Sequence, residues 1–225
     1  MAISDCVMSM RTQKNRGRRP VGRTLRVWIL ALVAACAVPA LPQTKPPTVA
    51  PIPAQLTLKL DTAQSQLHWS LGSTLHTVHG TFTLKRGSLQ FDPASGSASG
   101  EFAADATSGQ SGNESRDTKM HREILESARF TEVVFRPDRI EGKVLAQGSS
   151  NVQVHGMFLL HGSEHELTVP VQAELAGSQW KGSAKFSVPY IQWGLKSPNT
   201  FLLKADPVVE IDLEVTGTIH PTGAP

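Results

Sequence analysis

The feature of this sequence that most constrains its fold is a repeated alternation of apolar and polar residues. The cleanest example is 209–215, VEIDLEV, in which every second residue is apolar. Similar runs occur at 56–60, 67–71, 81–91, 152–160, 167–175 and 181–188. A period of two places alternate side chains on opposite faces of a β-strand, so each run predicts a strand with one apolar face.

One stretch, Asn113–Phe135, interrupts the alternation and separates two strand-rich halves. Within it Met120, Ile124 and Leu125 fall at helical spacing and form one apolar face. We expect the carboxylate of Asp117 to cap the first helical turn. The last residues of the stretch return to a period of two, which predicts a strand directly after the helix. The helix is therefore expected to cover an opening in the sheet.

About eight long antiparallel strands, each with one apolar face, must either stack as two sheets or close into a barrel. The alternation by itself is compatible with both arrangements. Several runs extend over about ten residues, and strands of that length favour a strongly bent sheet wrapped on itself. The predicted fold class is therefore all-β with one short helix, as an extended barrel of about eight strands.

The first 40 residues have the composition of an export signal. Seven arginine and lysine residues precede Val27–Val38, an apolar run too short for a membrane anchor. Small residues at Val38 and Ala40 suit cleavage after Ala40, which predicts a periplasmic or secreted protein. Alternatively, Val33–Cys36 matches the pattern at which bacterial lipoproteins are cut and acylated, which would anchor the protein to the membrane through Cys36.

The sequence after this signal divides into a Pro-rich linker at 41–55, a domain at 56–217 and a tail at 218–225. Without the first 40 residues the chain keeps 15 of its 22 basic and 18 of its 19 acidic residues, a formal charge of −3. A mildly acidic domain without a basic block predicts no nucleic-acid partner. Both cysteines, Cys6 and Cys36, precede the domain, so no disulfide is expected within it.

An ordered set of short features resembles the YceI-like, polyisoprenoid-binding family of exported bacterial proteins. These features are His68–Leu71, His79–Phe82, Leu89–Asp92, Arg116–Asp117, Phe130–Phe135, Gly156, Gly162 and Trp193–Leu195. The resemblance covers about residues 56–217 and implies a lipocalin-like barrel with a helix near its mouth. The implied ligand is an isoprenoid chain of quinone or polyprenyl type, or another long amphiphile. The chain departs from the family at Tyr190–Gln192, where members often carry an Arg-Ser-Asp type sequence.

The strand pattern offers candidates for the wall of a ligand-binding lumen. They are Leu67, Trp69, Phe82, Phe102, Val133, Phe135, Phe158, Phe186 and Val209. Each buried methylene of a ligand contributes roughly 0.8 kcal/mol, so an isoprenoid tail needs no strong polar contact. Without the resemblance, a barrel filled by its own side chains would satisfy the same pattern.

Four further residues are candidates for the mouth of the barrel or for contact with a ligand head group. The guanidinium of Arg116 could bind a phosphate or carbonyl oxygen, or it could form a surface ion pair with Glu114 or Asp117. Tyr190 and Trp193 could close the end of the barrel, or they could stack on a quinone ring with Lys196 near its oxygen.

All eight histidines lie after the first 40 residues, and His161 and His165 flank a predicted hairpin turn where they could share a transition metal. No cysteine or carboxylate at a recognised spacing completes such a site. His76 with His79, and His121 near Met120, form weaker candidates of the same kind.

The domain has no G-x-S-x-G or H-E-x-x-H motif and no cysteine nucleophile, so no enzymatic activity is predicted. The predicted function is binding, transport or sequestration of a long amphiphilic lipid, with no other cofactor and only transient membrane contact unless Cys36 is acylated. Two alternatives are a structural or stress-associated module without a ligand, and a histidine-based metal binder. The sequence is compatible with a homodimer.

Overall fold

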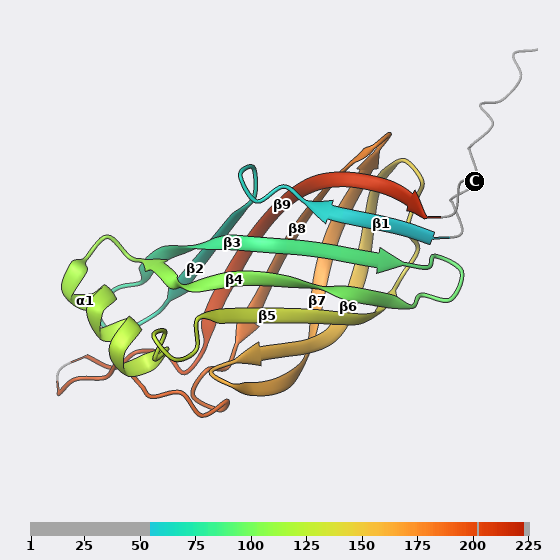
Figure 1. The fold of residues 1–225 in the computed structure, drawn as a ribbon. Coiled ribbons are helices and arrows are strands. Elements are labelled where there is room, and N and C mark those ends of the chain that lie inside the picture. The colour runs from blue at the N-terminus through green and yellow to red at the C-terminus, as the bar shows by residue number, and fades with distance from the viewer. Residues whose placement is uncertain (1–54, 202, 223–225) are drawn as a thin grey trace, which may run out of the picture. The chain divides into compact units, whose positions relative to one another are not determined.

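The computed structural model describes residues 55–201 and 203–222, which form one antiparallel sheet closed on itself (Figure 1). The strands are β1 (Gln55–Leu60), β2 (Gln66–Leu71), β3 (Val78–Phe91), β4 (Ala98–Gln110), β5 (Glu132–Glu141), β6 (Gly148–Leu160), β7 (Ser163–Ala176), β8 (Gln179–Val188) and β9 (Val209–Thr222). Between β4 and β5 the chain forms the helix α1 (Glu114–Lys119) and a π-helical turn, η1 (Met120–Ile124). The predicted export signal at 1–40, residues 41–54 of the predicted linker and residues 223–225 of the predicted tail lie outside the described residues.

Two of the nine strands share a single position in the barrel wall. β1 pairs with residues 88–91 of β3 and 217–222 of β9, whereas β2 pairs with residues 78–82 and 210–214 of the same two strands. The nine strands therefore fill eight positions, and the pairing of β3 with β4 completes the ring. The predicted antiparallel barrel of about eight strands with one short helix is confirmed.

A hydrogen-bonded turn connects β1 to β2 without opening the wall. The hydroxyl of Ser65 donates to the carbonyl of Asp61 at 2.6 Å and accepts from the backbone N–H of Thr216 in β9 at 3.1 Å. The Ser65 hydroxyl thus accepts from the Thr216 N–H, which has no strand partner at the break between β1 and β2.

The barrel is complete within residues 55–222. β9 runs beyond Gly217, the predicted end of the domain, to Thr222, which pairs with Gln55 of β1. All strand pairings of the described chain fall inside the compact unit Pro47–Pro225. No helix in the part of the chain that the structure describes is long and apolar enough to cross a bilayer.

The two ends of the barrel differ in their packing. The helix end is where β4 ends, β5 begins and α1 lies (Figure 1), and the far end is where β3 ends and β4 begins. The far end holds the larger cluster of buried residues, Leu56, Leu89, Phe91, Ala98, Ile140, Val152 and Leu175. A smaller buried cluster at the helix end consists of Leu160, Val188, Tyr190 and Leu195.

Asn113 caps α1, and the prediction that Asp117 does so is wrong. The side chain of Asn113 accepts a hydrogen bond from the backbone N–H of Arg116 at 3.0 Å, and its own backbone is extended. Asp117 lies inside the first turn, and its carboxylate instead accepts from the backbone N–H and the hydroxyl of Ser111. Asn and Asp are both good N-cap residues, so the sequence alone did not rank these two positions.

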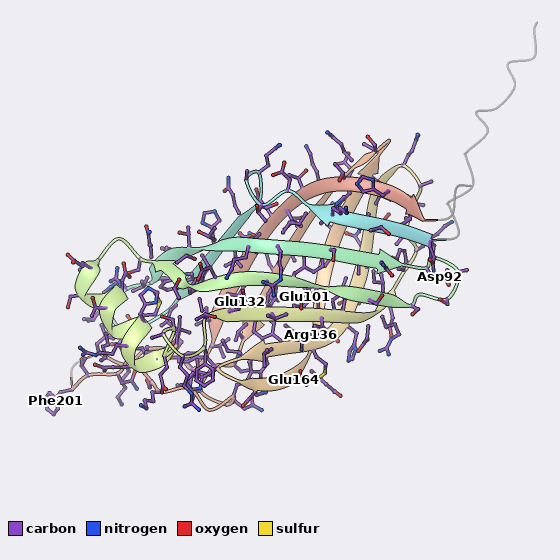
Figure 2. The ribbon with its side chains drawn as sticks, viewed as in Figure 1. Asp92, Glu101, Glu132, Arg136, Glu164 and Phe201 are labelled. Carbon is purple, nitrogen blue, oxygen red and sulfur yellow. The ribbon has the colours of Figure 1, made fainter. Side chains whose placement is uncertain are left out.

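A row of charged side chains crosses the outer wall over β3, β4 and β5 (Figure 2). Arg86 donates to Glu101 at 2.7 Å and to both carboxylate oxygens of Glu132 at 2.9 Å. Arg136 continues the row between Glu101, at 3.7 Å, and Glu164, at 3.1 Å. The hydrogen bonds from Arg86 are the largest cause that lowers the pKa of Glu132 to about 2.

Candidate functional site

The barrel encloses a cavity of about 610 Å³ whose wall includes residues from both ends. All nine predicted lumen residues lie on this wall: Leu67, Trp69, Phe82, Phe102, Val133, Phe135, Phe158, Phe186 and Val209. At the helix end, Met120, Ile124 and Leu125 complete the lining, so the apolar face of the helical segment does cover the opening. Ligand contact by these residues stays a prediction.

The polar groups of the cavity wall are concentrated at the helix end. They are Ser73, His76, Asn113, Ser115, Arg116, Lys119, Tyr190 and Thr200, with Ser183 of β8 as the exception. Two side chains on the wall, Arg116 and Lys119, are cations, and no described aspartate or glutamate lines the cavity. The bore is thus apolar along its length and electropositive at its mouth.

Trp69 places an unsatisfied hydrogen-bond donor in this apolar wall. The residue is only 7% exposed, and its indole Nε1–H has no hydrogen-bond partner among the described residues. Its ring lies against Gly80, where an added Cβ would come within 2.4 Å of two ring carbons. By contrast, the indole N–H of Trp180 donates to the carbonyl of Lys59 at 3.2 Å. Because buried donors are normally paired, the Trp69 N–H can serve an oxygen atom of a guest in the bore.

Arg116 is held at the mouth by a hydroxyl and a carbonyl rather than by a carboxylate. Its Nε donates to the hydroxyl of Ser111 at 2.7 Å, and its Nη2 donates to the carbonyl of the same residue at 2.9 Å. The Ser111 hydroxyl in turn contacts the carboxylate of Asp117. No described carboxylate forms an ion pair with Arg116, so the surface ion pair with Glu114 or Asp117 is not what the structure shows.

Lys119, which sequence reasoning missed, takes the place at the mouth expected for Lys196. Its Nζ donates to the carbonyl of Pro198 at 3.2 Å, and the residue lines the cavity. Lys196 has a side chain that is 71% exposed, lies 3.8 Å from Glu126 and does not line the cavity. The helical spacing of Arg116 and Lys119, three residues apart, is a sequence signal that could have identified the pair.

Tyr190 and Trp193 occupy different environments although they are neighbours in sequence. Tyr190 is 4% exposed and lines the cavity, and its hydroxyl donates to the carbonyl of Asp206 at 2.9 Å. Burial raises the pKa of this phenol. Trp193 lies off the cavity wall, with its ring 5.6 Å from that of Phe158 and stacked on His165 at 4.3 Å. Trp193 therefore packs at the end of the barrel and does not face the bore.

The two histidines of the hairpin turn pack against separate aromatic rings. His165 stacks on Trp193, and His161 lies 4.3 Å from the ring of Phe130. Glu126 is the carboxylate near His161, at 3.5 Å from its Nε2. Among the described residues, no group of three or more histidine, cysteine or acidic side chains could hold a metal ion. The arrangement thus supplies no complete coordination shell for the metal-binding alternative.

His121 fastens the helical segment to the barrel. Its Nε2 lies 2.9 Å from the carbonyl of Gly109 at the end of β4, and because a carbonyl only accepts, this nitrogen is the donor. Its Nδ1 lies 3.0 Å from the hydroxyl of Ser127, which is 4% exposed. An added Cβ at Gly109 would come within 2.7 Å of Met120. Close packing and two hydrogen bonds therefore hold α1 and η1, which together we call the lid, over the mouth.

Comparison with known proteins gives a family and a fold. Residues 58–217 match the sequence model of the YceI-like domain. The structure resembles that of BcnA from Burkholderia cenocepacia with a TM-score of 0.56 at 16% identity, covering 70% of this chain and 98% of the other. It also resembles a structure described as a polyisoprenoid binding domain from Saccharophagus degradans, with a TM-score of 0.55 at 14% identity, covering 74% and 99%. A search of curated proteins finds no match.

Proposed function

The chain belongs to the YceI-like domain family, and from that premise we propose that it binds a long amphiphilic lipid, of isoprenoid type, in the bore of its barrel. The binding is non-catalytic, and it serves transport or sequestration of the lipid. A quinone or a polyprenyl alcohol or phosphate fits this description. The polyisoprenoid named for the Saccharophagus degradans domain supports the ligand class.

The observation that carries the proposal is the open apolar bore. Its volume of about 610 Å³ falls in the range of roughly 300–1,000 Å³ that small-molecule sites occupy. Burial of about ten methylene groups there would contribute roughly 8 kcal/mol before the costs of association. A ligand-free structural module has no evident use for such a cavity, since its wall forgoes the dispersion contacts that a filled core would make.

The polar groups of the bore suit the oxygen atoms of such a lipid. Arg116 and Lys119 stand at the mouth, where a phosphate, carbonyl or hydroxyl head group would lie if the apolar tail entered first. The unpaired N–H of Trp69 offers a further donor on the wall of the bore. With no carboxylate on the described wall, an anionic head group would meet no repulsion.

The place of action follows from the sequence features at the N-terminus. A basic segment followed by a short apolar run supports export to the periplasm or the medium. If Cys36 is acylated, the Pro-rich segment after it would tether the barrel to a membrane. Both routes would give the barrel access to lipids of the cell envelope.

The test is uptake of a defined probe by residues 47–225, which contain the complete barrel. Titration with geranylgeraniol should change the tryptophan fluorescence to a saturating value, because Trp69 lies on the wall of the bore. Ala184, 5% exposed and on the same wall, provides a way to block the site. A folded Ala184→Phe variant should lose the saturable change.

The matched control is Lys185→Phe, which adds the same ring to the outward-facing neighbour of Ala184. Lys185 makes only a surface ion pair with Asp212, so its loss should cost little. Saturable binding by the control and none by Ala184→Phe would support a guest in the bore. Equal binding by both variants, or none by the unaltered barrel, would refute it.

A further inference from the structure

Large apolar side chains are exposed at both ends of the barrel, but the two most exposed lie beside the mouth. Among the described residues the exposed set is Leu75 at 71%, Leu145 at 39%, Ile191 at 36% and Phe201 at 100%. Phe201 belongs to the segment between β8 and β9 and projects at the helix end (Figure 2). Leu75 belongs to the turn between β2 and β3, which join at the same end.

Phe201 stands at the tip of a turn that is closed by hydrogen bonds. The backbone N–H of Thr200 donates to the carbonyl of Leu203 at 2.9 Å, and the N–H of Leu203 donates to the Thr200 hydroxyl at 3.1 Å. Leu203 and Thr200 line the cavity. The same short turn therefore directs one side chain into solvent and two into the bore.

Leu75 is presented in a similar way on the neighbouring turn. The hydroxyl of Ser73 donates to the carbonyl of His76 at 2.6 Å and so closes the turn around Leu75. Ser73 and His76 also line the cavity. Like Phe201, Leu75 is thus an exposed apolar tip flanked by residues of the cavity wall.

Backbone hydrogen bonds join the two turns into one surface. The N–H of Thr74 donates to the carbonyl of Lys204 at 3.0 Å, and the N–H of Asp206 donates to the carbonyl of Gly72 at 2.8 Å. We call residues 72–77 together with 197–201 and 203–206 the rim. These hydrogen bonds hold the turns of Leu75 and Phe201 beside each other at the edge of the opening.

We propose that the rim docks on the surface of a lipid bilayer, with Phe201 and Leu75 entering the boundary between head groups and acyl chains. This inference rests on the proposed function, since docking would bring the mouth of the bore to the source of its lipid. Aromatic and leucine side chains opposite cationic ones are typical of surfaces that lie in this boundary. The two tips would enter first, and the cations beside the mouth would meet the head groups.

Charge and shape favour a bilayer over a protein partner. Lys204 lies on the rim, and Lys119 and Arg116 line the mouth next to it. The rim has one acidic residue, Asp206, whose carboxylate lies close to Gly72. The two apolar tips are separate side chains, whereas a stable protein interface buries roughly 800 Å² on each partner. Anionic lipids should therefore strengthen docking, although the remainder of the domain is mildly acidic.

The test uses residues 47–225 and flotation with vesicles of phosphatidylcholine containing phosphatidylglycerol. The shortened protein avoids the apolar run at Val27–Val38, which would bind vesicles by itself. The unaltered barrel should float with the vesicles, and Phe201→Ser with Leu75→Ser should weaken the partitioning about tenfold or more. Leu145→Ser, at an exposed leucine between β5 and β6 at the far end, is the matched control and should float like the unaltered barrel.

Phe201→Trp gives a second readout that requires no loss of function. Its fluorescence should move to shorter wavelength when vesicles are added, because the indole would leave water. An unshifted spectrum, unaltered flotation of the double variant, or an equal loss in Leu145→Ser would overturn the proposal. So would a loss of self-association in the double variant without a change in flotation, since the rim would then be an interface between copies of the chain.

Uptake of geranylgeraniol distinguishes this proposal from the function on which it rests. Delivered from ethanol, the probe should bind the double variant as tightly as the unaltered barrel. Delivered from vesicles, it should enter the double variant more slowly. Rim-dependent flotation without uptake of geranylgeraniol by any variant would support docking and refute the lipid-binding function. Uptake of geranylgeraniol without flotation would support the lipid-binding function and refute docking.

Discussion

The far end and the helix end of the barrel are built from similar strands but packed in different ways. At the far end, seven buried residues, including Phe91, form one cluster. At the helix end the buried cluster has four residues, and cations, hydroxyls and a lid surround the opening. We therefore expect the far end to contribute more to stability and the helix end to admit the proposed ligand.

Truncation of a ring at each end should give the largest difference. Phe91→Ala, at a residue 5% exposed, should lower the free energy of unfolding by about 3–5 kcal/mol. Phe82→Ala should cost about half as much, since the side chain of Phe82 is only partly buried whereas that of Phe91 is buried. Urea unfolding of both variants checks the comparison. Equal losses would show that the far end has no special share in stability.

Removal of the histidine that fastens the lid should affect the helix end alone. His121→Ala breaks the hydrogen bonds to Gly109 and Ser127 and leaves their groups unpaired, which should cost the lid about 1–3 kcal/mol. Hydrogen exchange of the amides in η1 should accelerate, while those around Val152 at the far end stay protected. Faster exchange at both ends would mean that His121 supports the whole fold rather than the lid.

The mouth cation Arg116 should distinguish ligands by head group. Arg116→Ala should weaken geranylgeranyl phosphate about tenfold, the effect of roughly 1.4 kcal/mol, and geranylgeraniol much less. Arg122→Ala is the control, because that guanidinium pairs with Glu123, is 73% exposed and does not line the cavity. The measurement is a fluorescence titration with each ligand. Equal weakening of alcohol and phosphate would reject the head-group role.

Removing a charge from the row over β3, β4 and β5 should leave ligand binding unchanged and should have the smallest effect on stability. The pKa of Glu132 falls from an ordinary value of 4.5 to about 2 in the folded protein. Its carboxylate therefore stabilises the fold fully above about pH 4.5, and this contribution is lost as the pH falls toward 2. The difference in urea midpoint between the unaltered barrel and Glu132→Gln should be constant above about pH 4.5. It should shrink toward zero as the pH falls from about 4.5 to about 2. Geranylgeraniol affinity should be the same for both.

Alternation predicted which residues line the lumen because it reports directly on which face of a strand a residue occupies. The length of the runs, not the alternation, favoured closure into a barrel. Trp69 and Phe186 lie on the cavity wall as their strand positions required. The apolar face of Met120 and Ile124 likewise places the lid. The spacing of apolar residues could predict these positions because side chains repeat at a regular interval both along a strand and along a helix.

The mouth was harder to predict because its side chains come from turns and irregular segments. Nothing in the local sequence indicates that Lys119 reaches Pro198 or that His121 reaches Gly109, since both contacts join segments that only the folded chain brings together. Trp193 lies off the cavity wall, and its stacking on His165 likewise joins segments that are apart in the sequence. The exposure of Phe201 depends on the direction of a turn, which cannot be predicted from the spacing of apolar residues.

The presence of a lipid in the bore is tested most directly by native mass spectrometry of the protein purified without detergent from the cells that produce it. We expect the mass of the protein plus one lipid, which extraction should identify as an isoprenoid. The bare protein mass alone, together with no gain in mass when a long-chain ubiquinone or a polyprenol is offered, would contradict a lipid-binding bore.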